Sequence, residues 1–326
     1  LRRRVRIGSP QTAYVKISEG CNHGCSFCLI PRLRGPQRSC APEAVLQEVE
    51  GLAAEGVQEV ILVAQDTSAY GCDFEASVGL ADLLRQLVAC NGPAWIRVMY
   101  THPSFWTDAL IDVFADGGPL LPYVDIPIQH ISNRVLKAMG RSHDGDGTRA
   151  LLEKLRQRIP GLVLRTTVMT GHPEEGPAEF EELLSLLREF PFDRLGAFAY
   201  SAEQGTRSAL LEPQIGRAEA ELRRRSVLEL QRELAVRLHQ ERKGTTVELL
   251  IEGVQREKDY AVGRSYAEAP EVDGVIYVKA IGSTPQACVE PGDFLPARII
   301  GAGPYDLVAV PDKEIHPRGS DLRMPH

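Results

Sequence analysis

Six short apolar runs, interleaved with stretches of helical periodicity, dominate the first two hundred residues. The apolar runs cover residues 13–18, 57–65, 95–100, 123–129, 162–170 and 195–200, and the helical stretches cover 41–56, 80–90, 106–116, 132–139, 148–158 and 177–189. Continuous apolar strands that alternate with amphipathic helices indicate parallel strands covered by helices. Six strands are fewer than the eight of a closed barrel. We therefore predict an α/β fold built as a partial (β/α)6 barrel.

The pattern changes after residue 216. Residues 218–243 predict one long charged helix, and from residue 244 short strands are interrupted by Gly, Pro and Asp, which indicates a small all-β barrel. We expect a basic linker remnant over 1–12, a core domain over 13–243, the small barrel over 244–311 and a disordered tail over 312–326, where apolar periodicity is absent.

Composition and charge exclude several classes of protein. No apolar run reaches the ~18 residues that span a bilayer, and the basic start "LRRRVRIGSP" lacks the apolar core of a secretory signal. The formal charge of −7 argues against a general nucleic-acid binder. We therefore expect a cytoplasmic protein. Seven cysteines are an odd number, and a reducing compartment argues against a disulfide framework. We interpret four of the thiols as buried or incidental: Cys40, Cys72, Cys90 and Cys288.

The other three cysteines are gathered in the stretch "SEGCNHGCSFCLIPRLRG". Cys21, Cys25 and Cys28 have Cys-x3-Cys-x2-Cys spacing directly after the first predicted strand, at a sheet end where active sites collect. Thiolates suit zinc or an iron–sulfur cluster, and either site usually has four protein ligands. The nearest fourth candidates are His23, which lies inside the loop, and Cys40. Three cysteines on a [4Fe-4S] cluster would leave one iron open to a small molecule, and a zinc knuckle is the alternative.

This motif, with the aromatic Phe27 before its last cysteine, resembles the signature of radical S-adenosylmethionine enzymes. The resemblance implies a partial barrel in which the three thiolates hold a [4Fe-4S] cluster. It also implies that the free iron binds the amino and carboxylate groups of S-adenosylmethionine, and that an electron from the cluster cleaves this cofactor to a 5′-deoxyadenosyl radical. Phe27 would shield the cluster or stack on a ligand. The radical, rather than a protein side chain, would do the chemistry.

Further segments narrow the resemblance to the methylthiotransferases: "ILVAQDTSAYG", "DIPIQHISNRVLKAMGR", "RLGAFAYSAEQGT" and "GRSYAEAPEVDG", the last being most similar to their RimO branch. That branch implies methylthiolation of the β-carbon of an aspartate in the twelfth protein of the small ribosomal subunit. The small barrel would then be an OB-like TRAM domain, and a flavodoxin- or ferredoxin-like electron donor would be needed. The alternatives are a tRNA methylthiotransferase of the MiaB type and a catalytically incomplete homologue that only binds the ribosomal protein.

Polar residues at the ends of the predicted strands are candidates for binding. Gln65 and Asp66 would accept hydrogen bonds from the cofactor's amino group, although Asp66 could instead cap a turn. Gln129 could line the same pocket, and Arg165, inside an apolar strand, needs an anion such as the methionyl carboxylate. Four more residues are candidates for contact with substrate, with structural roles as the alternative: His130, Tyr200, Ser201 and Glu203.

The charge of the small barrel bears on the partner. Residues 244–311 contain ten acidic and five basic side chains, the opposite of what tRNA phosphates attract. We therefore expect no direct nucleic-acid binding and favour a basic ribosomal protein as partner, with a merely soluble acidic surface as the alternative.

Two departures from the family stand out. Relatives carry an N-terminal domain whose three cysteines bind a second cluster, whereas only twenty residues precede Cys21 here. We therefore expect a fragment, or a chain incomplete for sulfur transfer. In "TGHPEEGPAEF", His172, Glu174 and Gly176 replace the family's Phe, Gly and Thr. Glu174 is costly if the backbone needs a positive φ there.

Overall fold

A computed structural model describes residues 8–283 and 289–312. Cys288, the first seven residues of the expected linker and residues 313–326 of the expected tail lie outside the described residues. The chain divides into two compact units. One contains residues 14–55 and 59–232, and the other contains the first residues, 56–58 and the chain from 233 onward.

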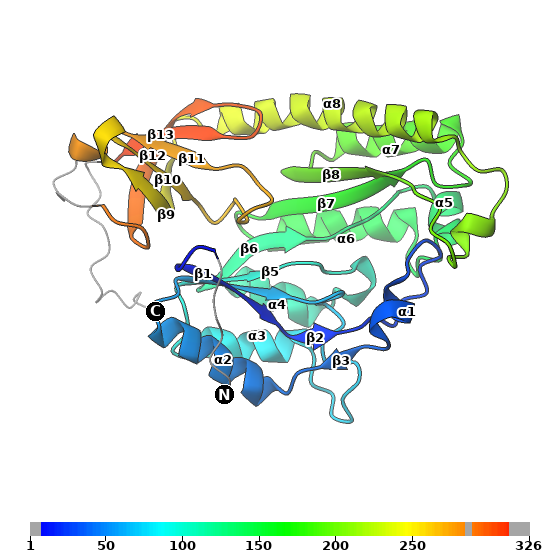
Figure 1. Cartoon of the computed structure of the whole chain (residues 1–326), viewed down its shortest axis with the longest axis horizontal. Helices are drawn as coiled ribbons and strands as arrows, with labels where there is room; N and C mark the ends of the chain where they lie inside the picture. Colours follow the sequence, from blue (N-terminus) through cyan, green and yellow to red (C-terminus); the bar gives the residue numbers. More distant parts are fainter. Residues whose placement is uncertain (1–7, 284–288, 313–326) are drawn as a thin grey trace. The chain divides into compact units, whose positions relative to one another are not determined.

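The first unit is built on a six-stranded sheet with the order β1-β4-β5-β6-β7-β8 (Figure 1). Its strands are β1 (Thr12–Lys16), β4 (Glu59–Val63), β5 (Trp95–Val98), β6 (Leu120–Asp125), β7 (Val163–Thr170) and β8 (Arg194–Ala199). The pairs from β4 to β8 are all parallel. This arrangement confirms the predicted α/β class with a partial barrel.

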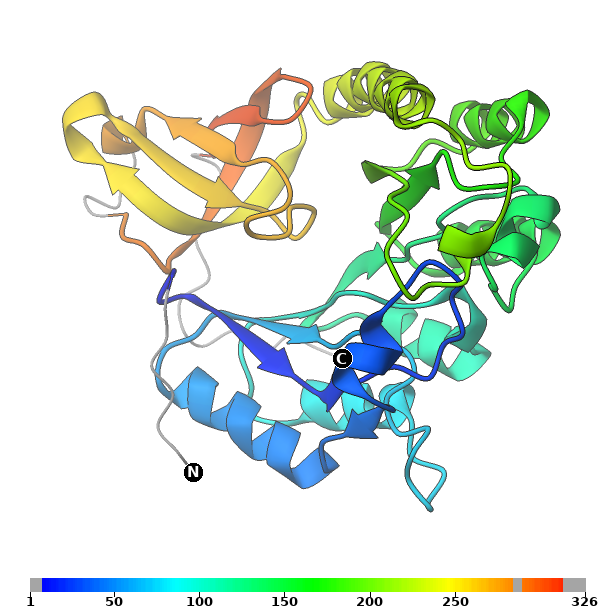
Figure 2. The same cartoon turned by 45° about the vertical axis from the view of Figure 1, so that its right-hand side comes forward.

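Helices connect the strands and cover the outer face of the curved sheet (Figure 2). They are α2 (Pro42–Ala54), α3 (Leu80–Ala89), α4 (Asp108–Asp116), α5 (Asn133–Ala138), α6 (Gly145–Arg158) and α7 (Pro177–Glu189). In α3 the buried residues Leu80, Leu83, Leu84 and Leu87 recur at three- and four-residue spacing, so one face of the helix packs against the sheet. Each such leucine contributes roughly 1.5–3 kcal/mol of burial.

Several strands end earlier than the sequence predicts, and the largest difference is at β6. The run predicted over 123–129 forms β6 only as far as Asp125, and Gln129 pairs with Val168 as an isolated bridge with a φ of 66°. The polypeptide therefore leaves the sheet after Asp125, at the carboxyl end of β6. Short elements that periodicity did not predict are β2 (Ser18–Glu19), α1 (Ile30–Arg34), β3 (Arg38–Ser39) and the 3-10 turns Pro103–Phe105 and Ser208–Leu210.

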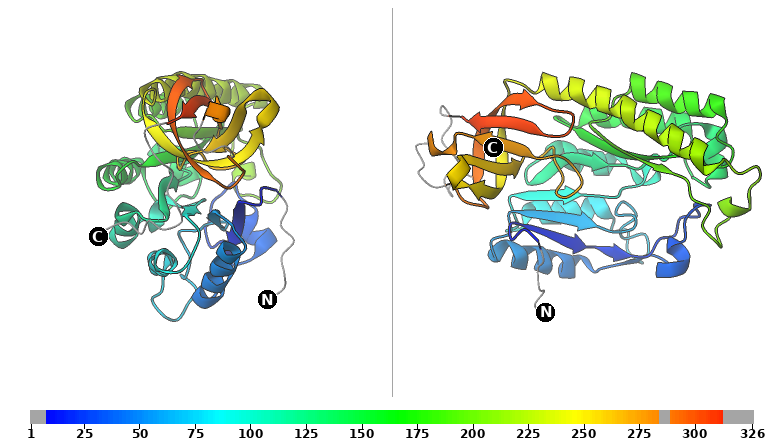
Figure 3. Two further views of the ribbon diagram at one scale, coloured as in Figure 1. Left: turned by 90° about the vertical axis from the view of Figure 1, so that its left-hand side faces the viewer. Right: turned by 45° about the horizontal axis from the view of Figure 1, so that its top comes forward.

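The helix α8 (Arg217–Glu241) leads into the second unit, a closed barrel with the strand order β10-β11-β13-β12-β9 (left panel of Figure 3). Its strands are β9 (Thr246–Gln255), β10 (Tyr260–Arg264), β11 (Ile276–Lys279), β12 (Phe294–Ala302) and β13 (Leu307–Pro311). Alternate residues such as Leu249 and Ile251 on β9 fill its core, the period-two pattern of a small barrel. Across the described residues, no helix is both long and apolar enough to span a bilayer.

Candidate functional site

The three clustered cysteines lie in the loop between β2 and α1, residues 20–29, which we call the cysteine loop. Gly20 opens it with a φ of +86°, and a Cβ at this position would lie 2.2 Å from the carbonyl oxygen of Pro36. The Gly20 amide donates to Gln65 Oε1 at 2.7 Å, and the Cys21 amide donates to the Gly35 carbonyl at 3.2 Å. A side chain at residue 20 is therefore excluded by both backbone conformation and space.

The middle of the cysteine loop is held by two other segments. The Ser26 amide donates to the Met139 carbonyl at 2.8 Å, and the Ser26 hydroxyl donates to the Ala138 carbonyl at 2.7 Å. The Arg207 guanidinium donates to the Gly24 carbonyl. The loop is thus fastened to the end of α5 on one side and to the segment after β8 on the other.

All three thiols are free and face one cavity of about 350 Å³, a volume in the range of small-molecule sites. Cys21 is buried, while Cys25 and Cys28 are partly exposed. The amides of His23 and Ile30 donate to the sulfurs of Cys21 and Cys28, each at 3.4 Å. Burial raises the pKa of the Cys21 and Cys28 thiols. A metal or cluster that binds here therefore displaces protons from them.

The remaining cavity wall is mostly apolar and comes from the cysteine loop, the start of α1, the carboxyl ends of neighbouring strands and the segment after α5. It contains Phe27, Ile30, Pro31, Ala64, Gln65, Asp66, Tyr100, Thr101, His102, Pro127, Gln129 and Arg141. Residues 64–66 follow β4, residues 100–102 follow β5 and residues 127–129 follow β6, so the cavity lies where active sites of this architecture are found. Four of the predicted cofactor-binding residues share it with the cysteines, namely Phe27, Gln65, Asp66 and Gln129.

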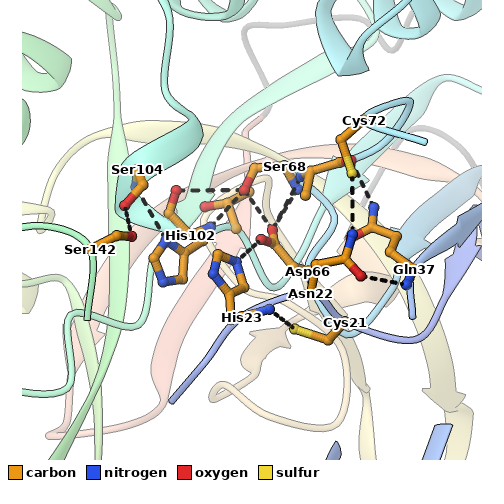
Figure 4. Close-up of polar contacts among 12 residues, drawn as sticks. Cys21, Asn22, His23, Gln37, Asp66, Ser68, Cys72, His102, Ser104 and Ser142 are labelled. Atoms are coloured by element: carbon orange, nitrogen blue, oxygen red, sulfur yellow. Dashed lines mark hydrogen bonds and ion pairs between the residues drawn. The ribbon is translucent and has the colours of Figure 1, made fainter. Parts of the chain in front are cut away.

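A histidine–aspartate group lines one side of the cavity (Figure 4). His23 Nε2 lies 2.5 Å from Asp66 Oδ2, and the His23 ring stacks on His102 with centroids 3.9 Å apart. Asp66 also accepts from the Ser68 hydroxyl at 2.6 Å, and that hydroxyl accepts from the His102 amide at 2.8 Å. Burial drives the pKa of His102 far below its usual range, with smaller effects from Arg141 and His23. His102 is therefore neutral.

Arg141 is a cavity residue that the sequence did not reveal. Its Nη2 donates to the Pro127 carbonyl at 2.8 Å, and its Nη1 lies 3.7 Å from Cys25 Sγ. Its Nε is buried and has no hydrogen-bond partner within the described part of the chain. No spacing rule links Arg141 to the cysteines; by contrast, Tyr100 and His102 could have been found because they follow a predicted strand.

Comparisons with known proteins identify the family. The model of the radical SAM superfamily matches residues 15–187, and that of the TRAM domain matches residues 244–311. "Ribosomal protein uS12 methylthiotransferase RimO" of Desulforudis audaxviator is 46% identical over 306 residues, which cover 94% of this chain and 66% of the relative. The protein of the same name from Syntrophomonas wolfei is 43% identical, over 94% of this chain and 68% of the relative. The chain belongs to the RimO family of radical SAM proteins.

This RimO-family chain spans about two thirds of the length of the curated relatives it matches. Among solved structures it is similar to the radical S-adenosylmethionine methyltransferase TsrM from Kitasatospora setae. That likeness has a TM-score of 0.50 at 20% identity and covers 60% of this chain and 39% of TsrM. It supports the fold.

Five residues proposed from the sequence do not reach the cavity of this RimO-family chain. Arg165 pairs instead with the buried Asp125, at 3.2 Å between Nη1 and Oδ1. His130 is fully buried, where its Nδ1 accepts from the Ser132 amide at 3.0 Å. Tyr200 is also buried, whereas Ser201 and Glu203 are exposed outside the cavity. His130 has no exposed side-chain surface and lies in the core, so its contact with substrate stays a prediction from the sequence.

The loop after β7 contains the departures from the usual RimO-family sequence. Glu174 has a φ of 80°, so the concern about replacing glycine there is confirmed: L-residues in this region cost roughly 1–2 kcal/mol. The Glu174 carboxylate is paired with Arg134, at 2.5 Å between Oε2 and Nη2. His172 is fully buried. The changes therefore place a strained residue and a fully buried histidine in this loop.

The donor set of the cavity decides which metal group fits it. No three His, Cys, Asp or Glu side chains within residues 8–283 and 289–312 converge closely enough to share a single metal ion, and a structural zinc site needs four ligands. In a [4Fe-4S] cluster each cysteine binds a different iron. Three thiols that face one cavity, beside an arginine whose Nε has no partner among the described residues, suit such a cluster with an anionic small molecule.

Proposed function

We propose that this chain carries the radical chemistry of a methylthiotransferase that modifies the β-carbon of an aspartate in ribosomal protein uS12. The observation that carries the proposal is the single cavity faced by Cys21, Cys25 and Cys28 in a chain 40–46% identical to proteins named as RimO. Sulfur insertion belongs to the same proposal. The ligands of the second cluster expected for the family are not visible in the sequence, since the remaining four cysteines are scattered.

Cys21, Cys25 and Cys28 would hold a [4Fe-4S] cluster. When bound, the cluster supplies the electron that cleaves S-adenosylmethionine to methionine and a 5′-deoxyadenosyl radical, which takes a hydrogen atom from the substrate carbon. The amides of His23 and Ile30 donate to two of the sulfurs, and Arg141 lies beside the third. These donors stabilise the thiolate forms of the ligands.

The other cavity residues would bind and orient S-adenosylmethionine. Arg141 is the better partner for its carboxylate, because Arg165 is paired with Asp125 outside the cavity. Asp66 acts through His23, which it holds against the cavity, since its oxygens accept from His23 and Ser68. Gln65 keeps its amide nitrogen available, because its oxygen accepts from Gly20. Gln129 reaches the wall after the chain leaves β6.

The apolar wall would keep water away from the reacting groups. Phe27, Ile30, Pro31, Ala64 and Pro127 contribute only carbon surface from their side chains. Excluding water prevents side reactions of a radical. Phe27 lies between the cluster ligands in the sequence and is the aromatic shield of this site.

A ribosomal protein as the partner is supported by the names of the relatives more than by the surface charge of the barrel. Among the described residues of the barrel, six acidic and four basic residues are exposed, so the acidic excess at the surface is smaller than the sequence total. Part of the difference comes from buried acidic groups such as Glu268, which pairs with Arg242 outside this range at 2.6 Å. This surface is compatible with a basic ribosomal protein and unsuited to strong phosphate binding. A flavodoxin- or ferredoxin-like donor would supply the electron.

Anaerobic reconstitution tests the proposal. The wild-type chain should take up about four irons and, with dithionite, convert S-adenosylmethionine to methionine and 5′-deoxyadenosine. Cys25→Ala should lose both properties, whereas Cys90→Ala, a free cysteine outside the cavity, should keep them. About eight irons would reveal a second cluster. A colourless, iron-free wild-type protein would overturn the proposal.

Mass spectrometry identifies the substrate. A methylthio group on an aspartate of uS12 supports the proposal, and the same group on tRNA would favour the MiaB-type alternative. Binding of uS12 without modification would favour the catalytically incomplete homologue.

A further inference from the structure

The serine inside the cysteine loop uses every hydrogen-bonding group that it has. Its amide and hydroxyl donate to Met139 and Ala138 at the end of α5. Its carbonyl accepts from the Ser208 amide at 2.9 Å, and its Oγ lies 2.7 Å from Ser208 Oγ. Ser26 therefore joins the loop to two segments more than a hundred residues away in the sequence.

These contacts continue into the core as one chain of four short contacts. In order, they are Ala138 O to Ser26 Oγ at 2.7 Å, Ser26 Oγ to Ser208 Oγ at 2.7 Å, Ser208 Oγ to His172 Nε2 at 2.7 Å, and His172 Nδ1 to Pro173 O at 2.6 Å. Ser26 is 5% exposed, and His172 and Ser208 are fully buried. Water cannot readily replace a missing partner at such positions.

The number of available protons decides whether all four contacts of this hydrogen-bonded chain can form at once. The carbonyls of Ala138 and Pro173 only accept, so each of the four contacts needs one proton of its own from the three side chains between them. Each serine supplies one, and a neutral imidazole supplies one, which makes three. Only an imidazolium at His172, with protons on both nitrogens, completes all four contacts.

The surroundings of His172 oppose that second proton. Burial lowers the pKa of His172, while the Pro173 carbonyl and Glu174 act in the other direction. The His172 ring also packs edge-on against Phe27 and Tyr200. The titratable and charged groups around it are Glu174 and Glu175 in its own loop, His130 after β6, Tyr200 after β8 and Arg223 on α8.

We propose that His172 and Ser208 are positioning residues, which hold the segment between Cys25 and Cys28 in place through Ser26. All four contacts of the hydrogen-bonded chain form only when His172 is protonated. In the neutral state His172 competes with Ser26 for the single proton of Ser208, so one contact of the chain is left without a proton. That the cysteines at the two ends of this segment bind a cluster rests on the proposed function. The hydrogen-bonded chain is independent of that function.

Removing either hydroxyl should change the pKa of His172 in the cluster-free protein. In Ser208→Ala the imidazolium loses its acceptor. In Ser26→Ala the Ser208 hydroxyl is free to donate to Nε2, which favours the neutral ring. Both variants should lower the pKa of His172 by about half to one pH unit, the size expected for one hydrogen bond. The effect of Ser26→Ala reaches His172 through two hydrogen bonds, by way of Ser208. A merely structural role of Ser26 would not change the pKa of His172 in this way.

The measurement is nitrogen NMR of histidine-labelled, cluster-free protein between pH 4 and 8. His172→Phe keeps an aromatic ring at the site and assigns the His172 signal by its absence. Ser265→Ala is the matched control, since Ser265 is fully buried and its hydroxyl is bonded to Glu268 in the other unit. An unchanged His172 pKa in Ser26→Ala would contradict the proposed coupling of Ser26 to His172 through Ser208.

A second measurement tests positioning. After reconstitution, Ser208→Ala should shift the midpoint potential of the cluster, and Ser265→Ala should not. Equal potentials in these two variants would overturn the positioning role even where the pKa values are coupled. If the wild-type protein takes up no iron, the proposed function fails, and the NMR result still decides whether the hydrogen-bonded chain exists.

Discussion

Asp66 holds His23 against the cavity with 2.5 Å between Oδ2 and Nε2. The two residues are 43 positions apart, one inside the cysteine loop and the other after β4. Asp66 is 2% exposed and accepts from the Ser68 amide and hydroxyl as well. The carboxylate therefore ties the cysteine loop to the carboxyl edge of the sheet.

We expect Asp66→Asn to lower the free energy of unfolding of the cluster-free chain by roughly 1.5–3 kcal/mol, the range for hydrogen bonds to a charged group. Urea unfolding measures it. Asp73→Asn is the control, because Asp73 also accepts from a serine, Ser39 Oγ at 2.6 Å, but is exposed. Equal losses in the two variants would contradict the role of burial.

Gly20→Ala separates collision from backbone strain. Gly20 and Gly35 have φ values of +86° and +77°, but an added Cβ meets the Pro36 oxygen at 2.2 Å only in the first case and meets nothing within 4 Å in the second. Gly35→Ala should cost roughly 1–3 kcal/mol for its backbone conformation alone, with φ 77° and ψ −169°, and Gly20→Ala should cost clearly more and abolish iron uptake. Thermal unfolding and iron analysis check both. Similar losses would mean that the loop moves away from Pro36.

Arg141 and Arg165 can be told apart by cofactor binding. Arg141→Met should weaken binding of S-adenosylmethionine to the reconstituted chain about ten-fold or more, since a charge-assisted hydrogen bond is lost. Arg165→Met should leave the Kd within about three-fold, because Arg165 pairs with Asp125 outside the cavity. Calorimetric titration measures both constants. A larger effect in Arg165→Met would restore the assignment made from the sequence.

Relief of backbone strain should make Glu174→Gly more stable than the wild type. The positive φ costs roughly 1–2 kcal/mol, and the exposed pair with Arg134 contributes about 0–1 kcal/mol. We expect a net gain of about 1 kcal/mol by urea unfolding, the centre of the range of about 0–2 kcal/mol that the two terms leave. Glu174→Gln keeps the strain and loses the charge, so it should be equal to the wild type or slightly less stable. If Glu174→Gly is less stable than Glu174→Gln, the backbone strain at residue 174 is negligible.

Acid should destabilise the chain through His130. Burial lowers the pKa of His130 to about 3, with His172 and Arg223 adding to the effect. Below the unfolded pKa of about 6.5 the unfolded chain binds a proton that the folded chain refuses, so stability falls as pH falls from 6.5 toward 3. In His130→Gln the slope between pH 6 and 5 should be smaller by about 1 kcal/mol per pH unit. The slopes between pH 8 and 7 should be equal, and a difference there would contradict the assignment.

The amino-acid sequence by itself determined the fold class and the metal-binding motif, because both are written in local spacing. Apolar runs that alternate with amphipathic stretches specify strands and helices, and three thiols within eight residues must lie together in any fold. The place of Gln65 and Asp66 at the end of a strand was also predictable, although β4 ends at Val63, two residues before the predicted end. The length of β6 was not, because Pro127 and the positive φ of Gln129 take the chain out of the sheet.

Only the tertiary structure decided which distant residues meet at the cavity. Arg141, rather than Arg165, faces the thiols because the segment after α5 folds back over Pro127. His23 meets Asp66 across 43 positions, and Ser208 reaches Ser26 across 182 positions. Such contacts depend on how loops from different strands converge at one edge of the sheet. Spacing along the chain does not encode that convergence, since it follows from packing of the whole domain.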